Sequence, residues 1–283
     1  MKRWTDFAGR GALVTGASSG IGRLLALRLA ENGARVGLVA RREDALVSLR
    51  EEIVSSGGEA IALPCDVGDR DEAEACVRQA ETALGGVDLL FNNAGYGRHR
   101  SFLEWDVEDM ERMMRVNYLG SLYFTKALAP EMARRGRGAL IFIASVAGRM
   151  APPDESAYAA SKFAMVGLAE AISIELEDSG IHVLTVCPGS INTPFFDEEA
   201  LSRMPPVARR SMVAPEKLVD AIFDSLARGK HQLTYPRSIA AGFISKALAP
   251  SFTRRQLRRV TLDALSSARG SRPKTRTEGP GER

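Results

Sequence analysis

Short apolar segments alternate with segments of helical apolar spacing along most of the chain. Six apolar segments rich in Val, Leu, Ile and Ala predict strands at 11–15, 35–40, 60–63, 87–91, 139–143 and 182–186, with a candidate for a last strand at 231–234. The segments between them predict helices at 21–31, 43–55, 71–83, 106–132, 158–178 and 216–227. Apolar strands that alternate with helices of about ten or more residues are typical of βαβ units in a parallel sheet.

The expected architecture is α/β. Because crossovers between parallel strands are right-handed, we expect a doubly wound, Rossmann-like parallel sheet with helices on both faces. The chain has no internal repeat and no linker before about residue 250, so we expect a single domain over 1–250 and a basic, helical C-terminal extension over 251–283. The last dozen residues are rich in Gly, Pro, Ser and Thr among charges, which predicts disorder.

The composition is that of a globular protein. Of 283 residues, 45% are hydrophobic and 26% are charged, which excludes a disordered, collagen-like or disulfide-scaffold chain. The net charge of +3 is unevenly placed: residues 254–283 hold nine Lys or Arg and three Asp or Glu, so they carry +6 and the rest carries −3. A mildly acidic body argues against a nucleic-acid partner.

The cysteines, the histidines and the N-terminal residues indicate where the protein works and whether it binds a metal. Cys65, Cys76 and Cys187 lie far apart and predict buried, reduced thiols, and the three histidines lack metal-ligand spacing. The N-terminus has no apolar signal-peptide core, and the longest uncharged run, 181–196, contains two prolines, so we expect no membrane span. These patterns predict a cytoplasmic protein without a metal.

The turn after the first predicted strand has the composition of a phosphate cradle. Residues 15–22 read TGASSGIG and lie between a strand and a helix. Glycines allow close approach to a ligand, and the N–H groups of a helix N-terminus suit a pyrophosphate. A glycine-rich turn without a ligand is the alternative, which the position after the first strand disfavours. The candidate cofactor contacts here are Gly16, Ser18, Ser19, Gly20, Ile21 and Gly22.

The end of the second predicted strand indicates which dinucleotide would bind. A carboxylate at this position would bind the ribose 2′-hydroxyl of NAD, but the chain has Arg41 and Arg42 there. Two guanidinium groups suit a 2′-phosphate, so we expect NADP(H) rather than NAD(H). The alternative is a solvated basic turn beside Glu43.

Tyr158 and Lys162 form a candidate catalytic pair. They are four residues apart on a predicted helix and therefore share one face. An ammonium about 4 Å from a phenol, at an effective dielectric of about 20, supplies about 4 kcal/mol, enough to lower a tyrosine pKa by about three units. Such a tyrosine can act as an acid or a base at neutral pH. Packing of the ring and solvation of the lysine are the ordinary alternative.

Other polar residues gather at the same edge of the predicted sheet. Ser145 ends the fifth strand, where its hydroxyl can donate to a carbonyl oxygen, although such a serine is often only a turn residue. Asn117 lies inside a helical run, where asparagine is locally unfavourable. Residues 92–95 follow the fourth strand and residues 188–194 follow the sixth, so both loops reach this edge.

Over residues 8–235 the chain resembles a classical short-chain dehydrogenase/reductase. The matching motifs, in the order and spacing of that family, are TGASSGIG at 15–22, CDV at 65–67, NNAG at 92–95, the Asn117 helix, Ser145, YAASK at 158–162 and PGSINTP at 188–194. The G-x3-G-x-G spacing of the first motif is the family's own and differs from the G-x-G-x-x-G fingerprint.

The resemblance implies catalytic roles for Asn117, Ser145, Tyr158 and Lys162. Tyr158 would be the general acid/base, Lys162 would lower its pKa and hold the nicotinamide ribose, Ser145 would polarise the carbonyl, and Asn117 would hold a relay water. The remaining implied cofactor contacts are Asp66 and Val67 at the adenine, Asn93, Ala94 and Gly95 on the adenosine side, Pro188 and Gly189 in the loop, and Ile191 and Thr193 at the carboxamide.

Two segments bear on the substrate and partners. In the family, residues matching 195–213 form a lid; its apolar side chains favour an apolar substrate, and packing of the lid on the body is the alternative. Residues 239–248 and 257–264 have apolar helical spacing, with four arginines in 254–259. Such a segment can lie on an anionic membrane, cap the pocket or join an oligomer interface.

The function predicted from the sequence is NADP(H)-dependent interconversion of a ketone and a secondary alcohol on a medium-sized apolar molecule. A non-catalytic dinucleotide-binding redox sensor is one alternative, and a peripheral membrane protein acting through its basic tail is another. The family resemblance also implies a homodimer or homotetramer built through the helices that bear Asn117 and Tyr158.

Overall fold

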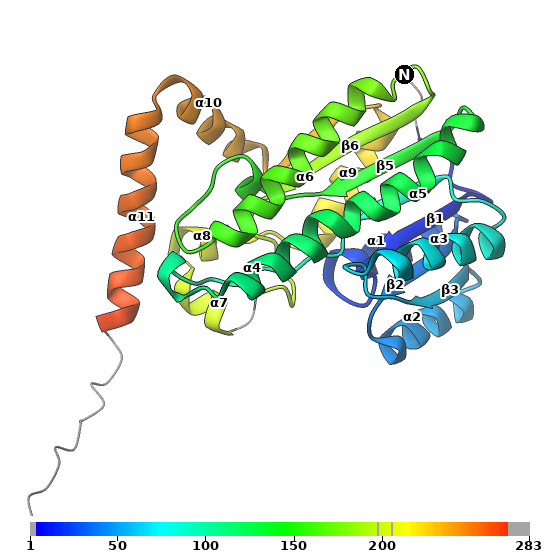
Figure 1. Ribbon diagram of the computed structural model, residues 1–283, viewed down its shortest axis with the longest axis horizontal. Helices are drawn as coiled ribbons and strands as arrows, with labels where there is room; N and C mark the ends of the chain where they lie inside the picture. Colours follow the sequence, from blue (N-terminus) through cyan, green and yellow to red (C-terminus); the bar gives the residue numbers. More distant parts are fainter. Residues whose placement is uncertain (1–3, 197, 205, 271–283) are drawn as a thin grey trace, which may run out of the picture.

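A computed structural model describes residues 4–196, 198–204 and 206–270 (Figure 1). Its centre is one seven-stranded sheet of order β3-β2-β1-β4-β5-β6-β7, in which every neighbouring pair is parallel. The strands are β1 Gly11–Thr15, β2 Arg35–Ala40, β3 Glu59–Pro64, β4 Leu89–Asn92, β5 Gly138–Ile143, β6 Ile181–Pro188 and β7 Gln232–Tyr235. The predicted doubly wound fold and its seven strands are confirmed. The predicted disorder of the last dozen residues lies outside the described part of the chain.

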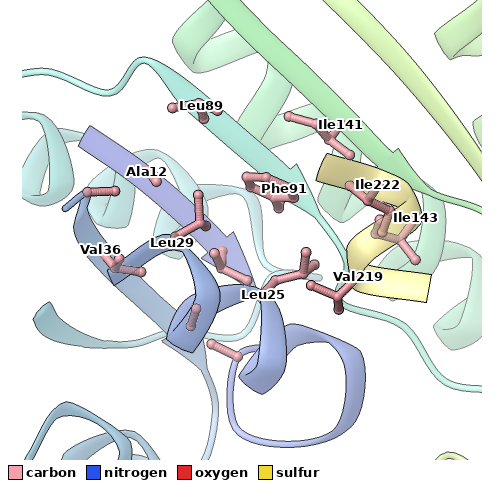
Figure 2. Close-up of a cluster of buried hydrophobic side chains, with 14 of the residues drawn as sticks. Ala12, Leu25, Leu29, Val36, Leu89, Phe91, Ile141, Ile143, Val219 and Ile222 are labelled. Carbon is pink, nitrogen blue, oxygen red and sulfur yellow. The ribbon is translucent and has the colours of Figure 1, made fainter. Parts of the chain in front are cut away.

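Helices cover both faces of the sheet. One face packs against α1 Gly20–Glu31, α2 Glu43–Ser55 and α9 Pro215–Ala227. Figure 2 shows this layer: Leu25 and Leu29 of α1 and Ile222 of α9 lie against strand side chains such as Phe91. The other face packs against α3 Arg70–Leu84, α5 Gly120–Arg134 and α6 Ser156–Glu175.

Strand residues alternate between these two layers. On β4, Leu89 and Phe91 belong to one core cluster and Leu90 to the other, and all three are fully buried. Side chains alternate across a strand, so a strand buried on both faces needs apolar residues at every position. This requirement produces the unbroken apolar runs from which the strands were predicted.

The helical region predicted over 106–132 is confirmed, and it contains a turn that was not predicted. The structure divides it into α4 Val107–Met114, a π-helical turn at Arg115–Leu119 and α5. The widened turn carries Asn117, whose side chain bonds to groups outside the helix. Single π-turns inside α-helices occur frequently at functional sites.

Of the described helices, α6 is the one long and apolar enough to cross a membrane by length and composition. In this fold it lies on the sheet beside β6, with Met165 and Ala169 in the core. Packing on the sheet therefore accounts for the apolar residues on the inner side of this helix.

The chain after β6 builds the outer part of the molecule. It forms α7 Glu198–Arg203 and α8 Pro206–Arg210, and an isolated bridge between Ile191 and Val213 closes this excursion. After β7 come α10 Ala240–Leu248 and α11 Pro250–Gly270, a helical hairpin that projects from one side of the sheet (Figure 1). Helices were expected after β7, over 239–248 and 257–264, whereas α7 and α8 were not predicted; the domain division at residue 250 stays a prediction.

Candidate active site

The glycine turn brings the start of α1 close to the end of β1. Gly16 and Gly20 have φ of +68° and +56°, a region that favours glycine. A Cβ on Gly22 would lie 2.2 Å from the Gly16 carbonyl oxygen, so α1 approaches the turn more closely than any side chain would allow. Of the six predicted contacts, Gly22 lies behind the turn, and the other five line the cavity described below.

A side chain that the sequence analysis did not single out ties this turn to β4. The Thr15 hydroxyl donates to the Phe91 carbonyl (3.1 Å) and accepts from the backbone N–H groups of Asn93 and Ala94 (3.0 Å each). The Asn93 amide in turn donates to the Thr15 carbonyl at 2.9 Å. Thr15 is 2% exposed, and its hydroxyl uses its donor and both acceptor positions. A threonine directly before the glycine turn was the available signal.

Two arginines stand at the end of β2, beside the glycine turn. Arg41 and Arg42 are both exposed and line the cavity, and Arg42 donates to the Ser18 hydroxyl at 3.1 Å. Asp66 and Val67, from the next loop, line the same region. The sequence thus places a paired positive charge, with no carboxylate at the end of β2, next to the predicted phosphate cradle.

Asn117 is fully buried and its amide is engaged on all sides. Its Oδ1 accepts from the Tyr96 N–H (3.0 Å), and its Nδ2 donates to the Tyr96 carbonyl and the Ser161 hydroxyl (2.9 Å each). These bonds hold the loop after β4 against α6 and account for the π-turn. A Cβ on Gly95 would lie 3.1 Å from Asn117 Oδ1 and 3.4 Å from Lys162 Nζ, so Gly95 keeps open the space between them.

Lys162 is 3% exposed and holds its ammonium inside the site. The Nζ donates to the Ile143 carbonyl at 2.9 Å and lies 5.8 Å from the centroid of the Tyr158 ring. Burial penalises the charge and lowers the pKa of Lys162 to about 8. The lysine therefore remains mostly protonated at neutral pH.

Tyr158 departs from the expected activation. Burial raises the pKa of its phenol above the ordinary value, and a hydrogen bond with Ser145 lowers it only part of the way. Ser145 itself accepts from the Ala147 N–H at 3.1 Å, in the short 3-10 turn Val146–Gly148 after β5. In this arrangement the phenol is protonated at neutral pH, because desolvation outweighs the stabilisation of the charged form.

The segment after β6 covers the tyrosine with aromatic rings. The Phe195 ring lies 5.7 Å from the Tyr158 ring and 5.1 Å from the Phe196 ring, centroid to centroid. Further along, Arg203 of α7 reaches Asp154, beside the start of α6, at 3.5 Å. The expected lid is therefore packed over the tyrosine, with its apolar side chains turned toward the site.

Two residues near the tyrosine were not predicted as site residues. His99 Nε2 lies 3.1 Å from Glu155 Oε1, and both side chains line the cavity. The negative charge of Glu155 is one of the causes that raise the pKa of Tyr158, after burial. Glu155 lies three residues before Tyr158 in the sequence, which was the only signal for its role.

The thiols are buried, as predicted. Cys187, near the end of β6, lies close to Lys162, and burial raises the pKa of this thiol to about 11. A thiol with that pKa is not a nucleophile at neutral pH.

One cavity of about 840 Å³ joins these groups. Every residue predicted for catalysis or cofactor binding lines it, apart from Gly22 and Asn117, which support its wall; Pro188, Gly189, Ile191 and Thr193 contribute the edge after β6. Its far end has a largely apolar lining of Met150, Pro152, Pro153, Phe195, Phe196, Met204, Leu257 and Val260, beside the polar pairs His99–Glu155 and Arg203–Asp154. Because Leu257 and Val260 belong to α11, the C-terminal extension forms part of the cavity wall.

The residues present fit a nicotinamide dinucleotide. The glycine cradle has no room for a Cβ at Gly22, and free N–H groups of a helix N-terminus suit a pyrophosphate. The cavity then runs from the two arginines past this cradle to Tyr158, where a nicotinamide ring would meet the substrate.

Comparison with known proteins agrees with this geometry. Residues 10–203 match the model of the short chain dehydrogenase family. The uncharacterized oxidoreductase YxnA of Bacillus subtilis is 33% identical over 93% of this chain and 75% of its own length. A 3-dehydrosphinganine reductase of Danio rerio is 38% identical over 68% of this chain, a match that spans 59% of that relative.

Further matches include a mammalian enzyme and a solved structure. A 3-ketodihydrosphingosine reductase of Bos taurus is 34% identical over 76% of this chain and 69% of that protein. The crystal structure of a Burkholderia phymatum short-chain dehydrogenase/reductase in complex with NAD superposes with a TM-score of 0.80 at 25% identity, covering 88% of this chain and 96% of that one. The chain therefore belongs to the short-chain dehydrogenase/reductase family, and it is an oxidoreductase with a Rossmann-like fold.

Proposed function

We propose that this oxidoreductase uses NADP(H) to interconvert a ketone and a secondary alcohol on a medium-sized apolar molecule. The observation that carries the proposal is the single cavity that joins Arg41 and Arg42 to Tyr158 and then to an apolar wall. One end offers cations for a 2′-phosphate, and the other offers a hydroxyl pair and apolar surface for a carbonyl compound.

The cofactor assignment rests on charge at the end of β2. Two exposed guanidinium groups at this point of the cavity would suit an adenosine 2′-phosphate, and β2 ends without a carboxylate that would repel it. The glycine cradle would hold the pyrophosphate, and Ile191 and Thr193 the nicotinamide end. When bound, the nicotinamide supplies or accepts the hydride. The Burkholderia relative solved with NAD makes NAD(H) the competing assignment.

Side chains of the protein supply the proton that the substrate oxygen takes up when a ketone is reduced. Ser145 lies near enough to Tyr158 to lower the pKa of its phenol, and both hydroxyls can donate to a carbonyl oxygen. Since burial keeps the phenol protonated, Tyr158 is ready to give its proton to the oxygen as a ketone is reduced. The buried ammonium of Lys162 holds positive charge beside the ring and stabilises the tyrosinate that follows. Asn117 positions the loop and helix that bear these groups.

The far wall of the cavity favours an apolar substrate. Phe195, Met204, Leu257 and Val260 present apolar surface, and His99 with Glu155 is a polar pair beside it. This wall suits an alkyl chain or ring system attached to a carbonyl that lies near Tyr158. Two relatives are named for reduction of a keto sphingoid compound, which supports a ketone on an apolar chain.

The test is NADPH oxidation with a series of 3-oxo compounds of about four to sixteen carbons. We expect kcat/KM to rise with chain length until the apolar wall is covered, because each buried methylene contributes about 0.8 kcal/mol. The matched control is Tyr158→Phe, which should lower kcat by about 10²–10⁴-fold while NADPH binding is kept.

Two outcomes would contradict the proposal. Full turnover by Tyr158→Phe would remove the tyrosine from the chemistry. Tight NADPH binding without turnover of any compound in the series would favour the redox sensor.

A further inference from the structure

The part of the α10–α11 hairpin over residues 240–261 carries charge of one sign, and Asp263 follows it in α11. Between residues 240 and 261 it has five basic side chains and no Asp or Glu. Four of them form two adjacent pairs on α11, Arg254 with Arg255 and Arg258 with Arg259, and the pairs are one helical turn apart. All four side chains are exposed. No ion pair joins these arginines to an acidic side chain in the described part of the chain. Their charge is therefore available to an anionic surface.

The same hairpin exposes large apolar side chains. Ile244 and Leu248 lie one turn apart on α10 and are 61% and 82% exposed. Phe252, just after the turn between the helices, is 55% exposed. Scattered apolar residues are normal on a protein surface, but three within nine positions, beside four arginines, form an amphipathic patch.

The two sides of α11 have different surroundings. Thr253, Leu257 and Thr261 recur at intervals of four and face the body: the two threonines are 7% exposed, and Leu257 and Thr261 line the cavity. Phe252 and Arg255 lie on the opposite side of the helix and are exposed. A hydrogen bond of 2.8 Å between the Ser245 and Thr253 hydroxyls joins α10 to α11. In Figure 1 the hairpin stands at the outer edge of the molecule, away from the sheet.

We propose that this patch, Ile244, Leu248 and Phe252 with the arginines of 254–259, docks on the surface of an anionic lipid bilayer. Phosphate headgroups attract clustered arginines, and the three apolar side chains can enter the boundary between headgroups and acyl chains. A second copy of the chain fits less well. Pairing the patch with itself would bring arginines together, and three side chains bury far less than the roughly 800 Å² per partner of a stable interface.

Docking would place the cavity at the membrane. The inner side of α11 lines the cavity, so a docked hairpin holds that wall beside the lipid. If the protein has the proposed function, an apolar ketone would pass between the bilayer and the cavity without crossing water. The docking itself does not depend on the substrate.

The experiment is co-sedimentation of the full chain with two kinds of vesicle. One is pure phosphatidylcholine and the other contains about 30% phosphatidylglycerol. We expect at least tenfold stronger binding to the anionic vesicles, and loss of most of it when salt rises from about 50 mM to about 500 mM.

Two variants locate the contact. The charge variant is Arg254→Gln/Arg255→Gln/Arg258→Gln/Arg259→Gln, and the apolar variant is Ile244→Ser/Leu248→Ser/Phe252→Ser. Each should weaken binding at least tenfold. The matched control is Val54→Ser/Arg78→Gln, which changes an exposed valine on α2 and an exposed arginine on α3 and should bind as the original protein does.

Hydrogen exchange of the unaltered protein tests the contact even if one of the variants fails to fold. Anionic vesicles should slow exchange within residues 240–261 and leave α2 unchanged. Equal binding to both vesicle types, absence of binding, or binding that survives both variants would overturn the proposal. So would a dimer in solution that the apolar variant dissociates, since a second copy would then cover the patch.

Discussion

The cavity wall built by β1 to β4 and the wall built after β6 are held together by different contacts. In the first, the contacts are made to main-chain atoms: Gly22 lies against the Gly16 carbonyl, and the Thr15 hydroxyl accepts from the N–H groups of residues 93 and 94. In the second, side chains from distant segments meet, as Phe195 does with Tyr158 and Arg203 with Asp154.

This difference predicts which wall of the cavity tolerates substitutions and which does not. A main-chain cradle depends on missing Cβ atoms and one hydroxyl, so few substitutions are tolerated there. A wall of side chains can change its residues and keep its shape, so it can adapt to a substrate. Equivalent substitutions in the two walls should therefore have unequal effects.

Glycine replacement should give the largest contrast. In Gly22→Ala the new Cβ would meet the Gly16 carbonyl oxygen at 2.2 Å, whereas in Gly189→Ala it would meet the Ile239 Cδ1 at 2.5 Å, the end of a flexible side chain. We expect Gly22→Ala to lower the free energy of unfolding by about 3 kcal/mol, despite better helix propensity, and Gly189→Ala by less than about 1 kcal/mol. Denaturant unfolding measures both; equal losses would contradict the contrast.

Replacement of a threonine in each wall should give a smaller contrast in stability. Thr15→Val leaves the N–H groups of Asn93 and Ala94 without their acceptor. We expect a loss of about 2 kcal/mol in the free energy of unfolding, limited because both residues line the cavity and water can reach them. Thr253→Val removes only the bond to Ser245 and should cost about 1 kcal/mol or less.

Hydrogen exchange distinguishes the two threonine variants further. Thr253→Val should speed exchange in α10 and α11 alone, whereas Thr15→Val should speed it across the sheet. A uniform effect of Thr253→Val would show that the hairpin is part of the global folding unit.

The same contrast explains how much could be predicted from the sequence. The strands were visible because burial on both faces demands unbroken apolar runs, and the cradle because glycines must stand at fixed spacing. The π-turn was missed because it depends on bonds from Asn117 to Tyr96 and Ser161, which are distant in the sequence.

The electrostatics of the tyrosine were also beyond the sequence. The spacing of Tyr158 and Lys162 suggested that the pKa of Tyr158 would be lowered. The structure shows two causes that raise it: burial under surrounding segments such as the one carrying Phe195, and the negative charge of Glu155. Nor could helical spacing decide that α11 would line the cavity. Each of these features is a tertiary contact of the second wall.

The smallest expected effect is a shift in the pH dependence of alcohol oxidation, which tests the surroundings of Tyr158. Oxidation of an alcohol needs the tyrosinate, so its rate should rise with pH toward the raised pKa of Tyr158. Glu155→Gln removes a negative charge that raises this pKa, so the profile should move to lower pH by about one unit or less.

The control is Glu170→Gln, an exposed carboxylate further along α6, which should leave the profile unchanged. A shift of the Glu155→Gln profile to higher pH would mean that the carboxylate acts in another way.

The most direct test of the account is a fluorescence titration with NADPH and NADH, made on the original protein and on Arg41→Ala/Arg42→Ala. We predict that the original protein binds NADPH at least tenfold more tightly than NADH. The double variant should lose about 10–100-fold in NADPH affinity, the worth of one or two charge-assisted hydrogen bonds, and change little toward NADH. Equal affinity for both cofactors, or an unchanged preference in the variant, would contradict the assignment of this cavity to NADP(H).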